Sequence, residues 1–262
     1  QPDRPFPLDL SVNNSTHSST SLPFPASPSS SDPPTRKPTH ITVGLWNSQS
    51  AVNKTIDISE LIVDRDLDIL CLNETWLKEA GDEVSIGEMT PSGYSFTHSP
   101  RTFGRGGGVA IIYRSAVNIK QCKQRSFKTF DYLDMCITAG KQTVRVVIIY
   151  RPCPTKSNKL TAREFFEEFP SLIADSSTHV SNFILIGDMN FHMDDCSNSE
   201  TKRITQILEP LGFSQLVTVP THVRGHILDV VWTKSPRLIR AVDVENTNMS
   251  DHFLVQLDTD LS

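Results

Sequence analysis

The sequence predicts a mixed α/β fold, and the order of its apolar segments provides three reasons. A strand, an amphipathic helix and a second strand follow one another within residues 41–76. Strand-like segments without an intervening helix then occupy residues 109–150. Finally, the apolar run 183–186 leads directly into Gly-Asp-Met-Asn, a pattern typical of a strand that is buried on both faces.

Length and composition limit the classes of protein that fit. A chain of 262 residues suits one large domain or two small ones. The longest apolar runs have only the length of a strand, so no membrane-spanning segment is predicted. The cysteines form an odd set without a Cys-x-x-Cys pair, which indicates a reducing compartment and neither a zinc site nor a disulfide framework. They are Cys71, Cys122, Cys136, Cys153 and Cys196.

Residues 1–40 differ in composition from the rest of the chain, since they contain nine Pro and nine Ser. Such a segment buries too little apolar surface to offset the entropy lost on ordering. We therefore predict a disordered Ser/Pro-rich leader or linker over 1–40 and a single domain over 41–262. Because the chain starts without Met and has no signal-peptide pattern, we expect a segment of a longer protein.

The first predicted strand, 41–47, ends at Asn47, and the second, 68–76, carries Glu74 near its end. Residues 54–65 between them form an amphipathic helix. A strand, helix, strand unit makes the two strands parallel neighbours, which places Asn47 and Glu74 side by side at one sheet edge. Alternatively, Asn47 is a turn cap and Glu74 a helix-start acid or a surface charge.

The middle of the chain predicts an antiparallel section with strands at 109–114, 117–122, 131–138 and 143–150. The glycines at 104–108 form a flexible turn, because they lack the Lys of a phosphate loop and precede a strand. Tyr150 and Arg151 stand before Pro152, which stops the last strand. A phenol and a guanidinium at a strand end can hold a phosphate, although a half-buried Tyr beside a surface Arg is the alternative.

Gly187 ends the apolar strand and allows a tight turn. Asp188 and Asn190 then lie at the carboxyl end of a central strand, where open α/β sheets bind their ligands. A carboxylate two residues from an amide suits activation of water beside a phosphate. An ordinary Asx turn after a strand is the alternative.

The remaining elements are two helices and two strands. The helix at 161–176 begins with a capping box of Thr161 and Glu164, and a helix at about 200–211 ends at Gly212. A strand near 226–232 carries Asp229, and Ser250-Asp251-His252 precede a final apolar strand. Eight polar residues stand at strand edges next to loops, where a layered sheet fold can collect them: Asn47, Glu74, Tyr150, Asp188, Asn190, Asp229, Asp251 and His252.

Charge is unevenly distributed along the chain. The whole chain has a net charge of −5, but residues 101–163 contain 13 Lys or Arg and two Asp, a net charge of +11. A basic region beside an acidic cluster fits a phosphodiester that approaches metal-binding carboxylates. A solvated surface with uneven charge is the alternative.

Six motifs in this order resemble the endonuclease/exonuclease/phosphatase family, and more closely the endonuclease domain of LINE-type (non-LTR) retrotransposons. They are Leu-Trp-Asn, Asn-Glu-Thr-Trp, Tyr-Arg-Pro, Gly-Asp-Met-Asn, Ile-Leu-Asp and Ser-Asp-His, and they cover about residues 41–258. Two positions depart from the pattern: Cys153 stands where a second Pro is usual, and Met189 replaces the common Phe. Neither is a position of expected catalysis.

The resemblance implies a four-layer sandwich of two packed mixed β-sheets flanked by helices. It also implies that Glu74, with Asn47 and Asp251 nearby, binds Mg²⁺, for which Mn²⁺ can substitute. Asp188 would orient or deprotonate the attacking water. Asn190 and Tyr150 would hold the scissile phosphate, and His252, paired with Asp229, would bind a phosphate oxygen as an imidazolium. Further phosphate contacts are implied for Thr221, Ser250 and Arg151. Structural or DNA-facing roles are implied for His192, His222 and His226.

The function implied is that of a Mg²⁺-dependent endonuclease that nicks double-stranded DNA and leaves a 3′-hydroxyl to prime reverse transcription. We then expect fusion to a reverse transcriptase in the full-length protein, action in the nucleus, and no membrane partner. The alternatives are a phosphomonoesterase or sphingomyelinase-like phosphodiesterase of the same fold, and an inactive DNA-binding remnant.

Overall fold

The computed structural model describes residues 40–122, 125–177 and 182–261. All of them belong to one compact unit, Arg36–Ser262. The leader predicted over 1–40 lies outside the described residues except for His40, so that prediction stays untested. No described helix has the length and the apolar character needed to span a membrane.

The described chain forms two mixed sheets of six strands each. The first sheet has the order β11 (Ile239–Glu245), β12 (Leu254–Thr259), β1 (Ile41–Asn47), β2 (Ile69–Asn73), β4 (Val109–Arg114) and β3 (Tyr94–Ser99). The second sheet has the order β5 (Asn118–Gln121), β6 (Asp131–Ala139), β7 (Gln142–Tyr150), β8 (Phe183–Asp188), β10 (Asp229–Thr233) and β9 (Ser214–Gln215).

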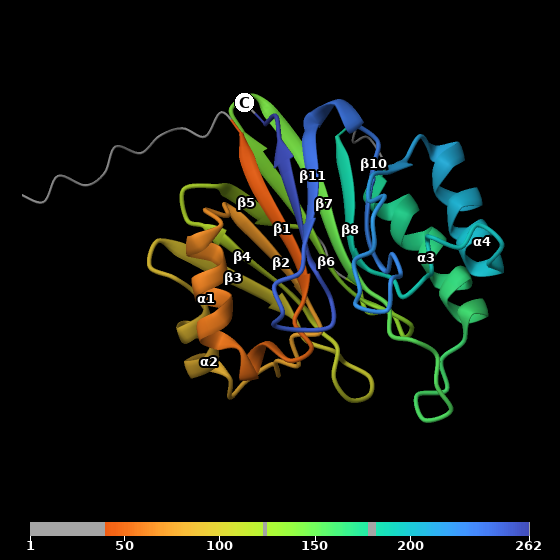
Figure 1. Cartoon of the computed structure of the whole chain (residues 1–262), viewed down its shortest axis with the longest axis horizontal. Coiled ribbons are helices and arrows are strands. Elements are labelled where there is room, and N and C mark those ends of the chain that lie inside the picture. The colour runs from red at the N-terminus through yellow and green to blue at the C-terminus, as the bar shows by residue number, and fades with distance from the viewer. Residues whose placement is uncertain (1–39, 123–124, 178–181, 262) are drawn as a thin grey trace, which may run out of the picture. The chain divides into compact units, whose positions relative to one another are not determined.

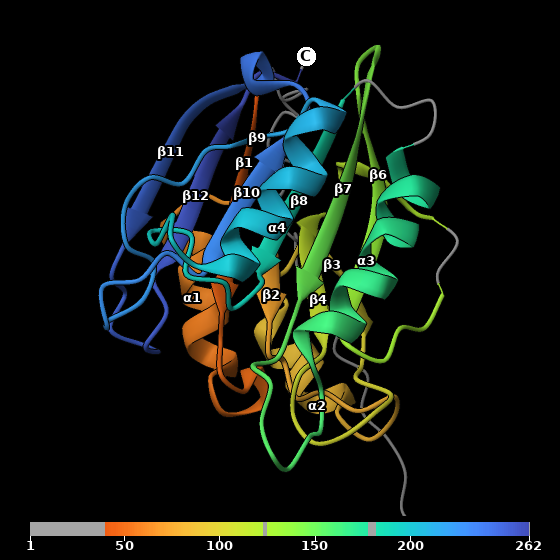
Figure 2. The ribbon, with the colours of Figure 1, turned by 90° about the vertical axis from the view of Figure 1, so that its right-hand side faces the viewer.

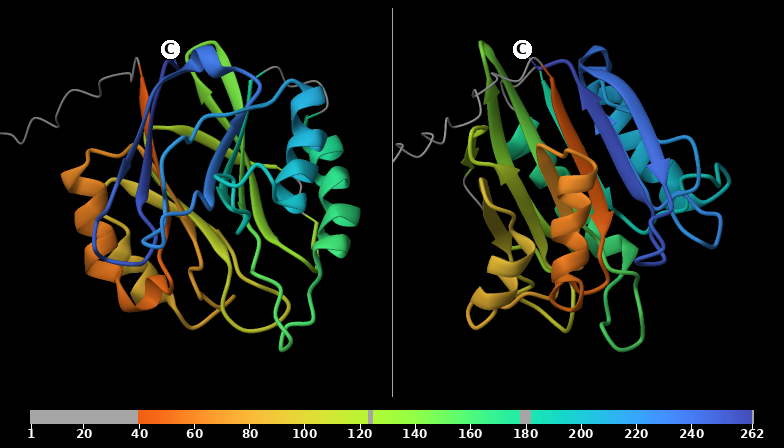
Figure 3. Two further views of the ribbon diagram at one scale, coloured as in Figure 1. Left: turned by 45° about the vertical axis from the view of Figure 1, so that its right-hand side comes forward. Right: turned by 60° about the vertical axis from the view of Figure 1, so that its left-hand side comes forward.

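Helices cover the outer face of each sheet. Figure 1 shows α1 (Thr55–Asp64) and α2 (Glu83–Met89) beside the first sheet, and α3 (Ala162–Ser177) and α4 (Ser199–Leu208) beside the second. Figure 2 shows α3 and α4 side by side across the second sheet, and Figure 3 shows the two helical layers on opposite sides of the sheets. Short 3₁₀ turns occupy Ala51–Asn53, Glu209–Leu211 and Pro236–Leu238. The predicted four-layer sandwich is confirmed.

Alternation of side chains along the strands explains the layers. In β1, Leu45 belongs to the apolar cluster between the sheets, whereas Trp46 packs in the cluster under α1 and α2. In β8, Ile186 faces the other sheet and Leu185 packs in the cluster under α3 and α4. Each sheet is therefore apolar on both faces, which is why its central strands are continuous hydrophobic runs.

Strand pairing confirms the main sequence predictions and corrects one. β1 and β2 are parallel neighbours with Asn47 opposite Asn73, and β5, β6 and β7 form an antiparallel meander. However, β4 lies in the first sheet, between β2 and β3, and does not continue that meander. Four of the described α-helices and strands went unpredicted: α2, β3, β9 and β11.

Gly187 allows the backbone of β8 to pack closely against that of its parallel neighbour β7. Its φ is +151°, and a Cβ atom at this position would lie 1.8 Å from the carbonyl oxygen of Ile149. Only glycine therefore allows the two backbones to approach this closely. As a result, Asp188 at the end of β8 lies beside Tyr150 at the end of β7.

Candidate active site

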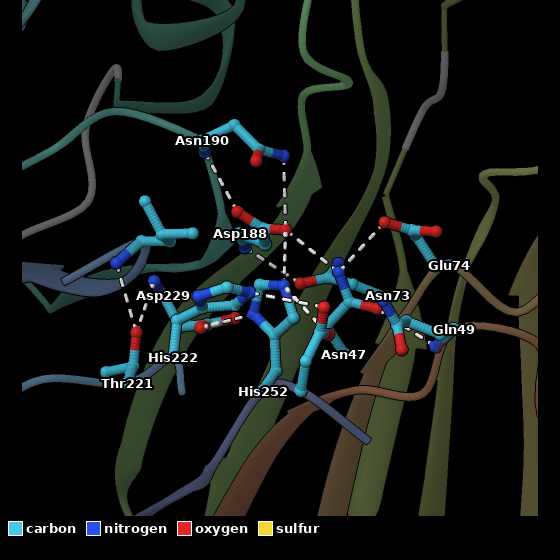
Figure 4. Close-up of polar contacts among 12 residues, drawn as sticks. Asn47, Gln49, Asn73, Glu74, Asp188, Asn190, Thr221, His222, Asp229 and His252 are labelled. Atoms are coloured by element: carbon cyan, nitrogen blue, oxygen red, sulfur yellow. Dashed lines mark hydrogen bonds and ion pairs between the residues drawn. The ribbon is translucent and has the colours of Figure 1, made fainter. Parts of the chain in front are cut away.

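The polar residues that follow strands of both sheets meet at one end of the sandwich (Figure 4). The parallel pairs β1–β2 and β7–β8 bring their carboxyl ends there, with Asn47, Glu74 and Asp188 among the side chains. β10 runs antiparallel to β8, so Asp229 at its start lies opposite Asp188. The loop before β12 adds His252.

Asp188 is fully buried and held by several donors. Its Oδ2 accepts hydrogen bonds from Asn47 Nδ2 at 2.8 Å and from Asn190 Nδ2 at 3.2 Å. Its Oδ1 accepts a hydrogen bond from the backbone N–H of Asn190 at 2.8 Å, and its own N–H donates to Asn73 Oδ1 at 2.8 Å. The carboxylate therefore has a fixed orientation.

The environment of Asp188 favours a proton acceptor that works near neutral pH. Burial raises the pKa of Asp188 to about 7, and the negative charge of Asp229 acts in the same direction. The positive charge of His252 and the hydrogen bonds from Asn190 and Asn47 partly oppose this rise. A general base is most effective when its pKa lies close to the working pH.

His252 and Asp229 form a buried ion pair with Nδ1 and Oδ2 2.8 Å apart. Burial by itself lowers the pKa of His252, but the charge and hydrogen bond of Asp229 raise it, and with Asp188 and Asp251 they bring it to about 10. The ring is then an imidazolium at neutral pH. Its Nε2 lies 3.8 Å from carboxylate oxygens of Asp188 and Asp251, beyond hydrogen-bond distance, so this N–H remains available to an anion.

Glu74 sits directly after β2 in a left-handed conformation, with φ of +52°. Asn47 Nδ2 donates to Glu74 Oε1 at 3.1 Å and so links the carboxylates of the two sheets. The amide oxygen of Asn47 accepts the backbone N–H of Gln49. In this orientation Asn47 positions Glu74 and Asp188, and direct metal ligation by its oxygen would require the amide to turn.

Tyr150 and Asn190 flank the carboxylates. Burial raises the pKa of Tyr150, and the charges of Glu74 and Asp188 raise it further, so its phenol keeps its proton. Asn190 has φ of +52°, and its Nδ2 also donates to the carbonyl of Arg151 at 2.8 Å. Its Oδ1 accepts from the Cys153 thiol at 3.0 Å. Both groups are therefore held with donors near the carboxylates.

The cluster fits a hard divalent cation. Three carboxylates, those of Asp188, Asp229 and Asp251, surround the imidazolium of His252, and Asn47 links a fourth, that of Glu74, to Asp188. The Oδ1 atoms of Asp229 and Asp251 are buried and have no hydrogen-bond partner within the described part of the chain. Oxygen ligands of this kind and excess negative charge suit Mg²⁺.

A comparison with protein families agrees with this geometry. Residues 44–252, which include all of the converging side chains, match the model of the Endonuclease/Exonuclease/phosphatase family. The chain belongs to this family. Its members are metal-dependent hydrolases that act on phosphodiester bonds.

Solved structures of the family share the fold of this chain. The endonuclease domain of TRAS1, a telomere-specific non-LTR retrotransposon, has a TM-score of 0.66 at 17% identity and covers 85% of this chain and 99% of its own. The AP endonuclease LMAP from Leishmania major has a TM-score of 0.66 at 14% identity, with coverage of 84% and 87%. The 3′ phosphatase NExo from Neisseria, bound to a product DNA hairpin, has a TM-score of 0.62 at 19% identity, with coverage of 84% and 99%. Among curated protein sequences no match was found.

Three residues that the sequence had assigned to substrate phosphate have partners inside the protein instead. Arg151 is 1% exposed, donates to the carbonyl of Met189 and lies over the ring of Phe191. The Thr221 hydroxyl is buried and accepts the backbone N–H groups of Leu228 and Asp229, which positions the start of β10. The Ser250 hydroxyl donates to backbone carbonyls of Asn47 and His252. We therefore leave these three out of the proposed substrate contacts.

Two further residues position the site: Asn73, which the sequence analysis did not assign to it, and His222, for which it implied a structural or DNA-facing role. Asn73, the last residue of β2, accepts from the Asp188 N–H and donates to the Ile149 carbonyl at 3.1 Å, so it joins the two sheets. The sequence feature that could have identified Asn73 is an amide side chain at the end of a buried apolar strand. His222 is buried, forms an isolated bridge with His252 and pairs with Asp251 at 3.2 Å. That role depends on a loop contact which the sequence does not reveal.

Several Lys and Arg side chains of the basic stretch 101–163 form ion pairs within the protein. Arg101, Arg114, Arg125, Lys128 and Arg145 each pair with an Asp or Glu. Arg105 is exposed and forms no ion pair with an acidic residue in the described part of the chain. Much of the stretch therefore neutralises charges of this protein, and fewer of its cations can contact a polyanion.

Proposed function

We propose that this chain is a Mg²⁺-dependent endonuclease that nicks double-stranded DNA and leaves a 3′-hydroxyl able to prime reverse transcription. The observation that carries the proposal is the convergence of Asp188, the Asp229–His252 pair and Glu74 from both sheets. The likeness to the TRAS1 endonuclease domain supports the choice of DNA and of a retrotransposon, although at 17% identity it shows the fold alone.

Each residue has a chemical role in this proposal. Asp188 accepts a proton from the water that attacks phosphorus, and its raised pKa suits that task. The free Nε2–H of His252 donates to a phosphate oxygen, while Asp229 keeps the ring charged and oriented. The protonated Tyr150 phenol donates to the scissile phosphate, and the Asn190 amide joins it when its Nδ2 exchanges the hydrogen bond to Asp188 for one to the phosphate. The bond to the 3′ oxygen then breaks.

Glu74 and Asp251 would hold the metal ion, with Asn47 orienting the Glu74 carboxylate. When bound, a divalent cation stabilises the negative charge that develops on the phosphate and the leaving oxygen. Mn²⁺ would substitute for Mg²⁺, since both prefer oxygen ligands. Fusion to a reverse transcriptase and action in the nucleus belong to the same proposal.

The test is a plasmid assay with the whole chain. We expect Mg²⁺ to convert supercoiled plasmid into the open-circular form, and a polymerase to extend the nick without prior removal of a 3′ phosphate. EDTA should stop the reaction, and Mn²⁺ should restore it. An exposed carboxylate on the edge strand β11 provides a control, because Asp243→Asn should nick at the wild-type rate.

Two results would contradict the proposal in different ways. Nicking that continues in EDTA would remove the metal from the mechanism. Intact plasmid, together with phosphate release from soluble phosphomonoesters or hydrolysis of sphingomyelin, would keep the family and replace the substrate.

A further inference from the structure

A groove of about 410 Å³ lies beside Glu74, between the residues that follow β2 and the Gly-rich loop before β4. We call it the Trp76 groove. Its lining includes Trp76, Lys78, Arg101, Arg105 and Gly106. An indole and three cationic side chains therefore line one concave surface together with a single carboxylate, that of Glu79, and none of the proposed catalytic roles uses this surface.

Trp76 is both exposed and firmly held. Its side chain is 42% exposed, whereas the other two tryptophans of the chain, Trp46 and Trp232, are buried. Its φ of +57° is one that bulky residues rarely adopt. The backbone N–H of Trp76 donates to the Gly107 carbonyl at 2.9 Å, and Gly106 packs so closely that a Cβ atom there would lie 3.1 Å from the indole. The loop thus holds a large aromatic ring at the surface.

Cationic groups accompany the indole. The guanidinium of Arg105 lies 5.9 Å from the centre of the Trp76 ring. The Arg101 side chain is 9% exposed and pairs with Asp131, yet its Nη2 is buried without a hydrogen-bond partner among the described residues. Aromatic rings that stack bases, next to cations that follow the phosphates, are how proteins bind single-stranded nucleic acid.

The groove adjoins the candidate active site through Trp76. Trp76 Nε1 donates to Glu74 Oε2 at 3.4 Å, so the indole contacts the expected metal ligand. A DNA strand with its scissile phosphate near Glu74 therefore has the Trp76 groove as a direct neighbour. A base within a duplex has both faces covered by adjacent bases, so only an unstacked nucleotide could lie against the indole.

We propose that the Trp76 groove binds one unpaired nucleotide of the DNA strand next to the cleavage site, with its base stacked on Trp76 and its phosphate on Arg105. This inference rests on the proposed nuclease function. It makes frayed, gapped or mismatched DNA a better ligand than a fully paired duplex of the same length.

Tryptophan fluorescence tests the proposal without cleavage. In EDTA, a ten-nucleotide oligothymidylate should quench the emission, because Trp76 is the exposed tryptophan, and a blunt hairpin duplex should quench it less. With a dye-labelled oligothymidylate, Trp76→Ala should raise Kd by about 5- to 150-fold. Trp76→Phe should keep most of the affinity, because a ring remains.

Matched variants separate stacking from charge and from folding. Val84, which is 77% exposed and lies in α2, provides Val84→Ala as a control that should bind like the wild type. Arg105→Ala should flatten the slope of log K against log salt by about 0.7, whereas Lys141→Ala in the β6–β7 turn should leave it unchanged. Equal affinity of wild type and Trp76→Ala would overturn the proposal.

The plasmid assay distinguishes this proposal from the one on which it rests. If the wild type leaves plasmid intact but binds dye-labelled oligothymidylate with an affinity that Trp76→Ala lowers, the groove is supported and the nuclease is refuted. If the wild type nicks plasmid but oligothymidylate neither quenches its emission nor binds more weakly to Trp76→Ala, the nuclease is supported and the groove is refuted.

Discussion

At the scale of single residues, the burial that suits Asp188 to its proposed chemical role also lowers the stability of the folded protein when this residue is ionised. It is fully buried, and its pKa is raised, so ionisation is harder in the folded than in the unfolded chain. The stability that protonated Asp188 contributes to the folded protein is fully present at a pH below the pKa of this residue in the unfolded chain. It is lost as the pH rises through the folded pKa of about 7. A charged Asp188 at pH 8 therefore opposes folding in the absence of metal.

Asp188→Asn should separate activity from stability. We expect nicking to fall by about 10²- to 10⁴-fold, because a proton acceptor is lost. Urea denaturation in EDTA at pH 8 should show a variant at least as stable as the wild type, since a buried charge is removed. Nicking within a factor of two of wild type would show that Asp188 is not the base, and the surface variant Asp243→Asn should change neither measurement.

Sequence alone located the chemical residues but not their orientations. Asn47, Glu74, Asp188, Asp229 and His252 follow from strands that end in polar residues, and the structure brings them together. The direction of a side chain at a strand end depends on contacts with distant segments. For that reason Arg151, one residue after Tyr150, packs against Phe191 and not among the carboxylates. The catalytic and metal-binding roles themselves stay predictions.

At the scale of elements, the close contact between β7 and β8 requires that residue 187 be a glycine, which has no side chain. Gly187→Ala would place a methyl group 1.8 Å from the Ile149 carbonyl oxygen, so the two strands would have to separate. We expect destabilisation of more than about 4 kcal/mol, the range of severe core defects. The measurement is the urea midpoint of the purified protein, or its soluble yield if the variant does not fold.

Gly87 supplies the control for this prediction. It lies within α2, and a Cβ atom there would meet nothing within 4 Å. Gly87→Ala should therefore stabilise the protein by up to about 1 kcal/mol through helix propensity. A Gly187→Ala protein as stable as Gly87→Ala would show that β7 and β8 can accommodate the methyl group.

Elements with strong periodicity were predictable, and weakly patterned ones were not. β1, β7 and β8 are nearly continuous apolar runs because both of their faces are covered. In contrast, β3 and β11 lie at the two edges of the first sheet and are only partly buried, so polar residues interrupt their pattern. The helix α2 has seven residues, too few to show a period.

At the scale of the whole molecule, the three apolar clusters that the described residues form begin at Ile41. A protein that begins at His40 should therefore unfold in one cooperative transition and nick plasmid at the rate of the full chain. Circular dichroism during heating and the plasmid assay measure the two properties. Loss of the transition would show that residues 1–39 contribute to the folded domain, contrary to the boundary predicted from composition.

Membership of the two sheets was beyond the sequence analysis. Successive strands usually pair with each other, which led β4 to be grouped with β5, β6 and β7. The chain instead passes from one sheet to the other after β4, and the apolar surface between the sheets is shared by both. The connection between Arg114 at the end of β4 and Asn118 at the start of β5 is short, and no local sequence pattern in it marks that crossing.

The position of β12 has a consequence for protein synthesis. This strand is inserted between β11 and β1, so the first sheet is complete only when residues more than 200 positions apart have paired. His252 lies just before it. While a ribosome is still translating the domain, Asp188 and Glu74 are already present, but the imidazolium and the strand that carries it into place are not. For the nuclease proposed above, activity toward nucleic acid would therefore arise only when translation of the domain is complete.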